Sequence, residues 1–112
     1  MERYIISARL KGGKAAEAER ALAHGPPFDP GEAGLTSHAA YLTQDAVYLL
    51  FEGETARTTA LRLARDHLVD VSRWQGIVDG LPSSVDEVPP EARSIYRWPA
   101  GSNSPDVMSL TS

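Results

Sequence analysis

The chain has 112 residues, 42% of them hydrophobic, and a formal net charge of −4. This length predicts one domain with enough apolar content to form a core. The negative net charge provides no basic field to attract nucleic acid or an anionic membrane. The absence of cysteine excludes disulfides, thiolate metal sites and cysteine nucleophiles.

Membrane insertion and secretion have no signal in the sequence. No apolar run approaches the roughly 20 residues that a membrane helix requires. The N-terminus lacks a basic segment followed by an apolar one. We therefore expect a cytoplasmic protein without membrane or nucleic-acid partners.

A strand and a helix are predicted over residues 3–24. Residues 3–10 carry β-branched and aromatic residues in an alternating apolar pattern, which is typical of a strand. Residues 15–24 follow the Lys11–Lys14 turn and are rich in alanine and other strong helix formers. Gly25 and the prolines after it end this helix, because glycine accepts the left-handed conformation and proline cannot continue the hydrogen-bond ladder.

Residues 36–43 and 46–52 predict a β-hairpin, because they are rich in the residue types that fit a pleated sheet. With Gln44 and Asp45 as the loop, alternation divides the hairpin into two faces. One face carries His38, Ala40, Leu42, Val47, Leu49 and Phe51, and the other carries Ala39, Tyr41, Ala46, Tyr48 and Leu50. Both faces are largely apolar, so both need covering. The sequence leaves open which face meets the helices.

The rest of the chain predicts a second helix over residues 56–69, a short extra helix over 70–79 and a last strand over 92–98. Residues 100–112 are rich in glycine, serine and proline and predict a poorly ordered tail. The folded domain is therefore expected to span residues 1–99.

The order strand, helix, strand, strand, helix, strand predicts an α+β, ferredoxin-like βαββαβ fold. Its antiparallel sheet has the strand order 4-1-3-2, with both helices on one face. The last strand is then expected beside the first. The other face would remain exposed and apolar, which monomers rarely tolerate. A second copy can cover that face, so we expect a homodimer.

The segment Tyr-Ile-Ile-Ser-Ala-Arg-Leu-Lys-Gly-Gly-Lys, residues 4–14, runs from a strand through a turn into an alanine-rich helix. The chain, over about residues 3–98, resembles the dimeric α/β-barrel superfamily. The Gly-Pro-Pro-Phe-Asp-Pro loop and the Phe-Glu-Gly strand end resemble small members of unknown function. In this superfamily two ferredoxin-like protomers press their open sheet faces together to form a barrel.

The resemblance implies a small-molecule-binding dimer. If the chain is an enzyme, the resemblance implies a cofactor-independent monooxygenase or cyclase that acts on an aromatic or polyketide-like compound. Whether the chain is an enzyme stays open. One alternative is a non-enzymatic structural or regulatory dimerisation module. Another is a haem-binding or haem-degrading enzyme. Fold resemblance alone does not choose among them.

His38 is the candidate catalytic residue, because an imidazole on a hairpin strand suits proton transfer near neutral pH. Its alternative is a structural histidine hydrogen-bonded to a neighbour. The candidate residues for binding a small apolar or aromatic ligand are Arg9, Tyr41, Tyr48, His67 and Trp74. Each has a plainer role as well, since aromatic residues commonly fill cores and interfaces. The histidines are scattered without metal-ligand spacing, so the sequence predicts no metal and no bound cofactor.

Overall fold

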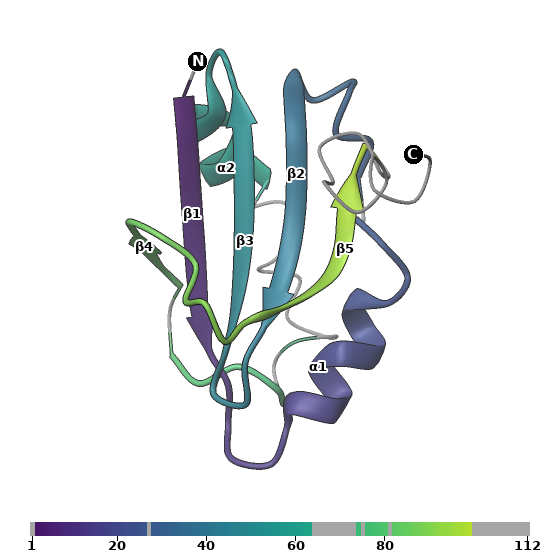
Figure 1. Cartoon of the computed structure of the whole chain (residues 1–112), viewed down its shortest axis with the longest axis vertical. Helices are drawn as coiled ribbons and strands as arrows, with labels where there is room; N and C mark the ends of the chain where they lie inside the picture. Colours follow the sequence, from purple (N-terminus) through teal and green to yellow (C-terminus); the bar gives the residue numbers. More distant parts are fainter. Residues whose placement is uncertain (1, 27, 64–73, 75, 81, 100–112) are drawn as a thin grey trace, which may run out of the picture.

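The fold is seen in a computed structural model, which describes residues 2–26, 28–63, 74, 76–80 and 82–99. It is a small α+β fold whose antiparallel sheet is compatible with a ferredoxin-like arrangement (Figure 1). The elements are β1 (Glu2–Arg9), α1 (Ala15–Leu22), β2 (Leu35–Leu42), β3 (Ala46–Gly53), α2 (Ala56–Leu63), β4 (Ser83–Val85) and β5 (Arg93–Trp98).

The first strand and helix form where the sequence predicts them. β1 pairs antiparallel with β3 along its whole length. α1 ends at Leu22, and the amide of Gly25 donates a hydrogen bond to the Leu22 carbonyl oxygen at 2.9 Å. Gly25 has a φ of 85°, a conformation that residues with a Cβ rarely adopt. Glycine therefore ends this helix in the predicted way.

The hairpin has the predicted register. Tyr41 faces Tyr48, and His38 faces Phe51. The Thr43 hydroxyl oxygen accepts hydrogen bonds from the amides of Asp45 and Ala46 at 3.1 and 3.0 Å. A threonine side chain thus stabilises a turn that lacks glycine.

The sheet differs from the prediction at both edges. Its order over the described residues is β4-β1-β3-β2-β5, so the last strand lies beside β2 and not beside β1. The place beside β1 is taken by β4, a three-residue strand that the sequence analysis missed. The predicted central run 1-3-2 is present, but the strand over 92–98 is at the opposite edge.

The helices cover the face of the sheet that carries His38. Buried residues of both helices share one core with the same set of strand residues, and in Figure 1 α2 lies behind β1 and β3. The strand members of this core are Ile6, Leu35, Ala40, Leu42, Val47, Leu49 and Phe51. This assignment answers the question that the hairpin pattern left open.

The face opposite the helices is less exposed than expected. Ile5 and Ala39 on this face are buried, and Tyr41, Tyr48 and Leu50 are half-buried. Figure 1 shows the connection between β4 and β5 passing in front of the lower part of the sheet. We call this surface the uncovered face.

Several predictions fall on residues outside the described ranges. The second helix is described only over Ala56–Leu63 of the predicted 56–69. Half of the predicted helix over 70–79, namely residues 70–73 and 75, also lies outside them, as do His67 and the whole tail over 100–112.

Candidate functional site

His38 is held in the core with both ring nitrogens hydrogen-bonded. Its Nδ1 lies 2.8 Å from the carbonyl oxygen of Leu50, and its Nε2 lies 2.7 Å from the Tyr96 hydroxyl. The side chain is 1% exposed. The rings of Phe28, Phe51 and Tyr96 surround it, with centroids 4.7 to 5.3 Å away.

These contacts define the protonation state of His38. A carbonyl oxygen only accepts, so Nδ1 carries the proton and donates it to Leu50. In the neutral ring Nε2 is then an acceptor, and the Tyr96 hydroxyl donates to it. Burial lowers the pKa of His38 to about 4, although the Leu50 carbonyl opposes the shift. His38 is therefore neutral near pH 7.

This geometry gives His38 a structural task. The lone pair that a base or a haem ligand would use accepts the Tyr96 proton instead. Burial also raises the pKa of Tyr96, so its hydroxyl stays a donor. The imidazole joins β2 to β3 and β5, and the predicted catalytic role has no supporting contact.

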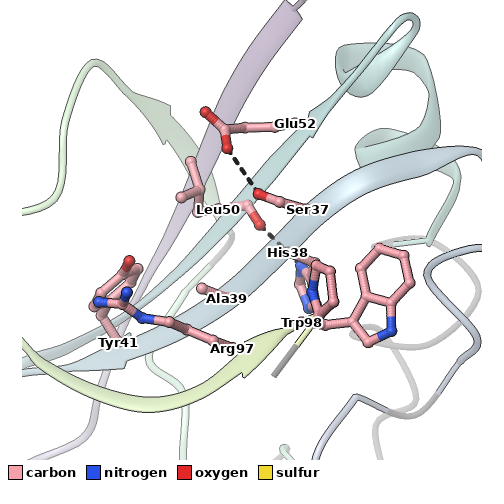
Figure 2. A pocket seen from close by; sticks show the side chains of 9 residues that line it. Ser37, His38, Ala39, Tyr41, Leu50, Glu52, Arg97 and Trp98 are labelled. Atoms are coloured by element: carbon pink, nitrogen blue, oxygen red, sulfur yellow. Dashed lines mark hydrogen bonds between the residues drawn. The ribbon is translucent and has the colours of Figure 1, made fainter. Parts of the chain in front are cut away.

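The uncovered face carries a hollow of about 140 Å³ near the C-terminal end of β5. Ala39, Tyr41, Leu50 and Trp98 are among the residues that line it. Its remaining lining residues are Ser37, His38, Glu52, Arg97 and Pro99, and Figure 2 shows how most of these side chains are arranged.

The polar groups of the hollow come from three different strands. The Ser37 hydroxyl on β2 donates a hydrogen bond to Glu52 Oε1 on β3 at 2.7 Å. Arg97 on β5 is exposed and lies across from Ala39 in the sheet register. In Figure 2 Glu52 and Ser37 lie at one side of the hollow, and Arg97 lies at the other side with Tyr41.

The ligand-binding candidates from the sequence do not form one site. Tyr41 and Tyr48 face each other on the uncovered face, as the register predicted, but of the described ligand-binding candidates only Tyr41 lines the hollow. Arg9 is exposed and lines a separate groove with Asp45 and Asp79. Trp74 is buried in the core.

Another groove, of about 700 Å³, runs between the start of α1 and the hairpin turn. Tyr48 lines it together with Glu91 and Arg93. Tyr48 is paired with Tyr41 in the sheet register, but it lines this groove and not the hollow.

Sequence reasoning missed most of the residues that line the hollow. Ser37, Glu52 and Arg97 are ordinary polar residues at strand positions, and no local motif marks them. Arg97 joins them only because β5 lies beside β2, and the predicted strand order placed that strand at the other edge. The alternation of the hairpin did contain one signal, since it puts Ser37 and Glu52 on the same face as Tyr41.

The described residues contain neither a metal-binding cluster nor a membrane-spanning helix. No group of three or more histidine, aspartate or glutamate side chains in those ranges is placed to hold a metal ion. No helix in the described part of the chain is long and apolar enough to cross a bilayer.

The chain matches no protein-family model, no curated protein and no solved structure. Membership of the dimeric α/β-barrel superfamily therefore stays a prediction, as does the cytoplasmic location. The function has to be argued from the site itself.

Proposed function

We propose that this chain is a small-molecule-binding protein that works as a homodimer through the uncovered face of its sheet. The observation that carries this proposal is the hollow beside Ala39. Its lining combines apolar side chains, such as Ala39 and Leu50, with the polar groups of Ser37, Glu52 and Arg97, and convergent polar groups can fix the orientation of a ligand.

The homodimer is supported by the side chains around the hollow. Tyr41, Tyr48 and Leu50 are half-buried on a face that neither α1 nor α2 covers. Tyrosine is enriched in protein interfaces, and a two-fold dimer lets this face cover its own copy. A partner sheet would close the hollow from above.

We favour a ligand-binding function over an enzymatic one because of the contacts of His38. A cofactor-independent oxygenase or cyclase needs a base that can reach its substrate, and both nitrogens of His38 are engaged. The same contacts argue against haem bound through His38, because the ligating lone pair is occupied. Purified protein that develops a Soret band on haem addition, and loses it in His38→Gln, would restore the haem alternative.

A second function, the non-enzymatic dimerisation module, is favoured by one observation. The hollow of about 140 Å³ in a single copy is smaller than the roughly 300–1,000 Å³ of sites for drug-sized ligands. If the partner sheet fills this space, the face is an interface alone.

A cavity-filling substitution separates these two functions. In Ala39→Leu the added side chain is expected to occupy part of the hollow, because Ala39 lines it. Ala23→Leu is the matched control, since Ala23 is exposed at the end of α1. Both variants and the unmodified chain are screened by ligand-induced thermal shift against a library of small polar and aromatic compounds.

The binding function predicts compounds that raise the melting temperature of the unmodified chain and of Ala23→Leu but not of Ala39→Leu. If no compound raises the melting temperature of the unmodified chain, the dimerisation-module function replaces the binding function. If Ala39→Leu keeps every shift, the ligand binds elsewhere and the hollow is not the site.

A further inference from the structure

Opposite charges line the hollow from strands that are not neighbours. Glu52 belongs to β3 and Arg97 to β5, with β2 between them. Figure 2 shows the two charged side chains at different sides of the hollow, with the small Ala39 side chain between them. A molecule in the hollow therefore meets a negative group at one end and a positive group at the other.

Neither charged side chain is neutralised by an ion pair recorded within the described ranges. The recorded hydrogen bond of the Glu52 carboxylate is the one from Ser37, which leaves acceptor capacity on its other oxygen. The Arg97 guanidinium offers five N–H donors and has no recorded partner among the described residues. Within the described part of the chain, both groups are therefore available to a ligand.

The sheet register fixes the spacing of the two charges. Glu52 lies across from Ser37, and Arg97 lies across from Ala39, two residues further along β2. Two strand spacings and two residues separate their Cα atoms by about 12 Å. The hollow of about 140 Å³ equals the liquid volume of about five water molecules. It suits a short molecule with a charge at each end.

We propose that the hollow binds a small zwitterion, with its ammonium group on Glu52 and its carboxylate on Arg97. This assignment rests on the proposed binding function and names the ligand class. A guanidinium matches a carboxylate with two parallel hydrogen bonds. The free Glu52 oxygen and the lone pairs of the Ser37 hydroxyl accept from the ammonium group.

Selectivity follows from charge balance. A simple carboxylate pairs with Arg97 but brings a second negative charge towards Glu52. A simple amine pairs with Glu52 and leaves Arg97 without a partner. Like charges brought together in a partly desolvated site weaken binding, so only a zwitterion gains from both ends.

The test is calorimetric titration of the full chain with ω-amino acids of increasing length. The probes are glycine, β-alanine, γ-aminobutyrate and δ-aminovalerate, with butyrate and butylamine as singly charged controls. At least one ω-amino acid is expected to bind about tenfold or more tightly than either control, which corresponds to about 1.4 kcal/mol. The fluorescence of Trp98, which lines the hollow, gives a second readout.

Charge-removing variants identify the two ends. Arg97→Gln is expected to lower the affinity for the best zwitterion to that of butylamine, and Glu52→Gln to that of butyrate. Arg20→Gln and Glu54→Gln are the matched controls, since both residues are exposed and lie outside the hollow. The controls are expected to bind as the unmodified chain does.

The outcomes separate this inference from the binding function on which it rests. Butyrate or butylamine binding as tightly as the best zwitterion overturns the inference, as does unchanged zwitterion affinity in both charge variants. If no ω-amino acid binds while neutral compounds bind and lose their effect in Ala39→Leu, the inference fails and the binding function stands. If no compound binds in the thermal-shift screen or in the calorimetric titration, both the inference and the binding function fail.

Discussion

At the scale of single residues, the His38 imidazole connects three strands. It comes from β2, donates to the Leu50 carbonyl on β3 and accepts from the Tyr96 hydroxyl on β5. β5 is an edge strand, and this hydrogen bond helps attach it to the sheet. Removing either partner leaves a buried polar atom without a bond, which costs more than the bond itself contributes.

Tyr96→Phe removes the donor to His38 Nε2 with little change of shape. We expect the free energy of unfolding to fall by about 1–3 kcal/mol, since a buried acceptor is left unsatisfied. Denaturant unfolding measures this loss. Tyr4→Phe is the matched control, because Tyr4 packs against the same core and its hydroxyl makes no hydrogen bond to another described residue. Equal stability of the two variants would contradict the role given to His38.

The lowered pKa of His38 predicts a pH dependence of stability. The folded chain takes up this proton near pH 4, and the unfolded chain takes it up near the ordinary value of 6.5. Between these values only the unfolded state is protonated at this site, so the stability present above about pH 6.5 is lost as the pH falls toward 4. The loss amounts to about 3 kcal/mol.

His38→Gln isolates this effect from the titration of the carboxylates. The variant lacks the imidazole, so the difference in unfolding free energy between it and the unmodified chain is expected to shrink between pH 6.5 and 4. Chemical denaturation at several pH values provides the comparison. A difference that stays constant over this range would show that His38 is not a buried neutral histidine.

At the scale of elements, Gly53 fixes the end of the hairpin beside the β2 bulge. A Cβ at this position would lie 3.0 Å from the Gly34 carbonyl oxygen and 3.3 Å from the Leu35 Cα. Both atoms are backbone, so they cannot move aside cheaply. The bulge between Leu35 and Ser37 sets the register that brings Ser37 to Glu52.

Gly53→Ala is therefore expected to destabilise the fold by about 1–3 kcal/mol, the usual range for overpacking. Gly12→Ala is the control, since a Cβ there meets nothing within 4 Å. We expect that control to be neutral or slightly stabilising. Thermal unfolding compares the two, and a Gly53→Ala chain as stable as the control would mean that the close approach is easily relieved.

The strands differ in how well the sequence predicted their positions. The hairpin register followed from alternation and from the polar loop, because each local preference agreed with the next. The strand at 92–98 was predicted in the right place along the chain but at the wrong edge, since its pattern says nothing about its neighbour. β4 was missed because Ser83-Ser84-Val85 is too short and polar to show a strand pattern.

The site was harder to predict than the fold for a physical reason. Both hairpin faces are apolar, so periodicity alone could not assign His38 to the core or to the uncovered face. Packing against the helices made that choice, and it put the Tyr41 face outside. The polar lining of the hollow then depends on contacts among three strands, which no single stretch of sequence contains.

At the scale of the whole molecule, the two sheet faces have different tasks. One is packed by the helices into a core in which no buried side-chain polar atom of a described residue lacks a hydrogen-bond partner. The other carries the hollow and the half-buried Tyr41, Tyr48 and Leu50. The homodimer proposal assigns this second face to a partner copy.

Sedimentation equilibrium of three chains tests the homodimer most directly. Leu50→Glu places a charge on the uncovered face, and Leu61→Glu places the same charge on α2, where Leu61 is 48% exposed. We predict twice the 12.1 kDa chain mass for the unmodified protein and for Leu61→Glu, and the single chain mass for Leu50→Glu. An unmodified protein that sediments as a monomer, or a Leu50→Glu chain that stays dimeric, would contradict the account.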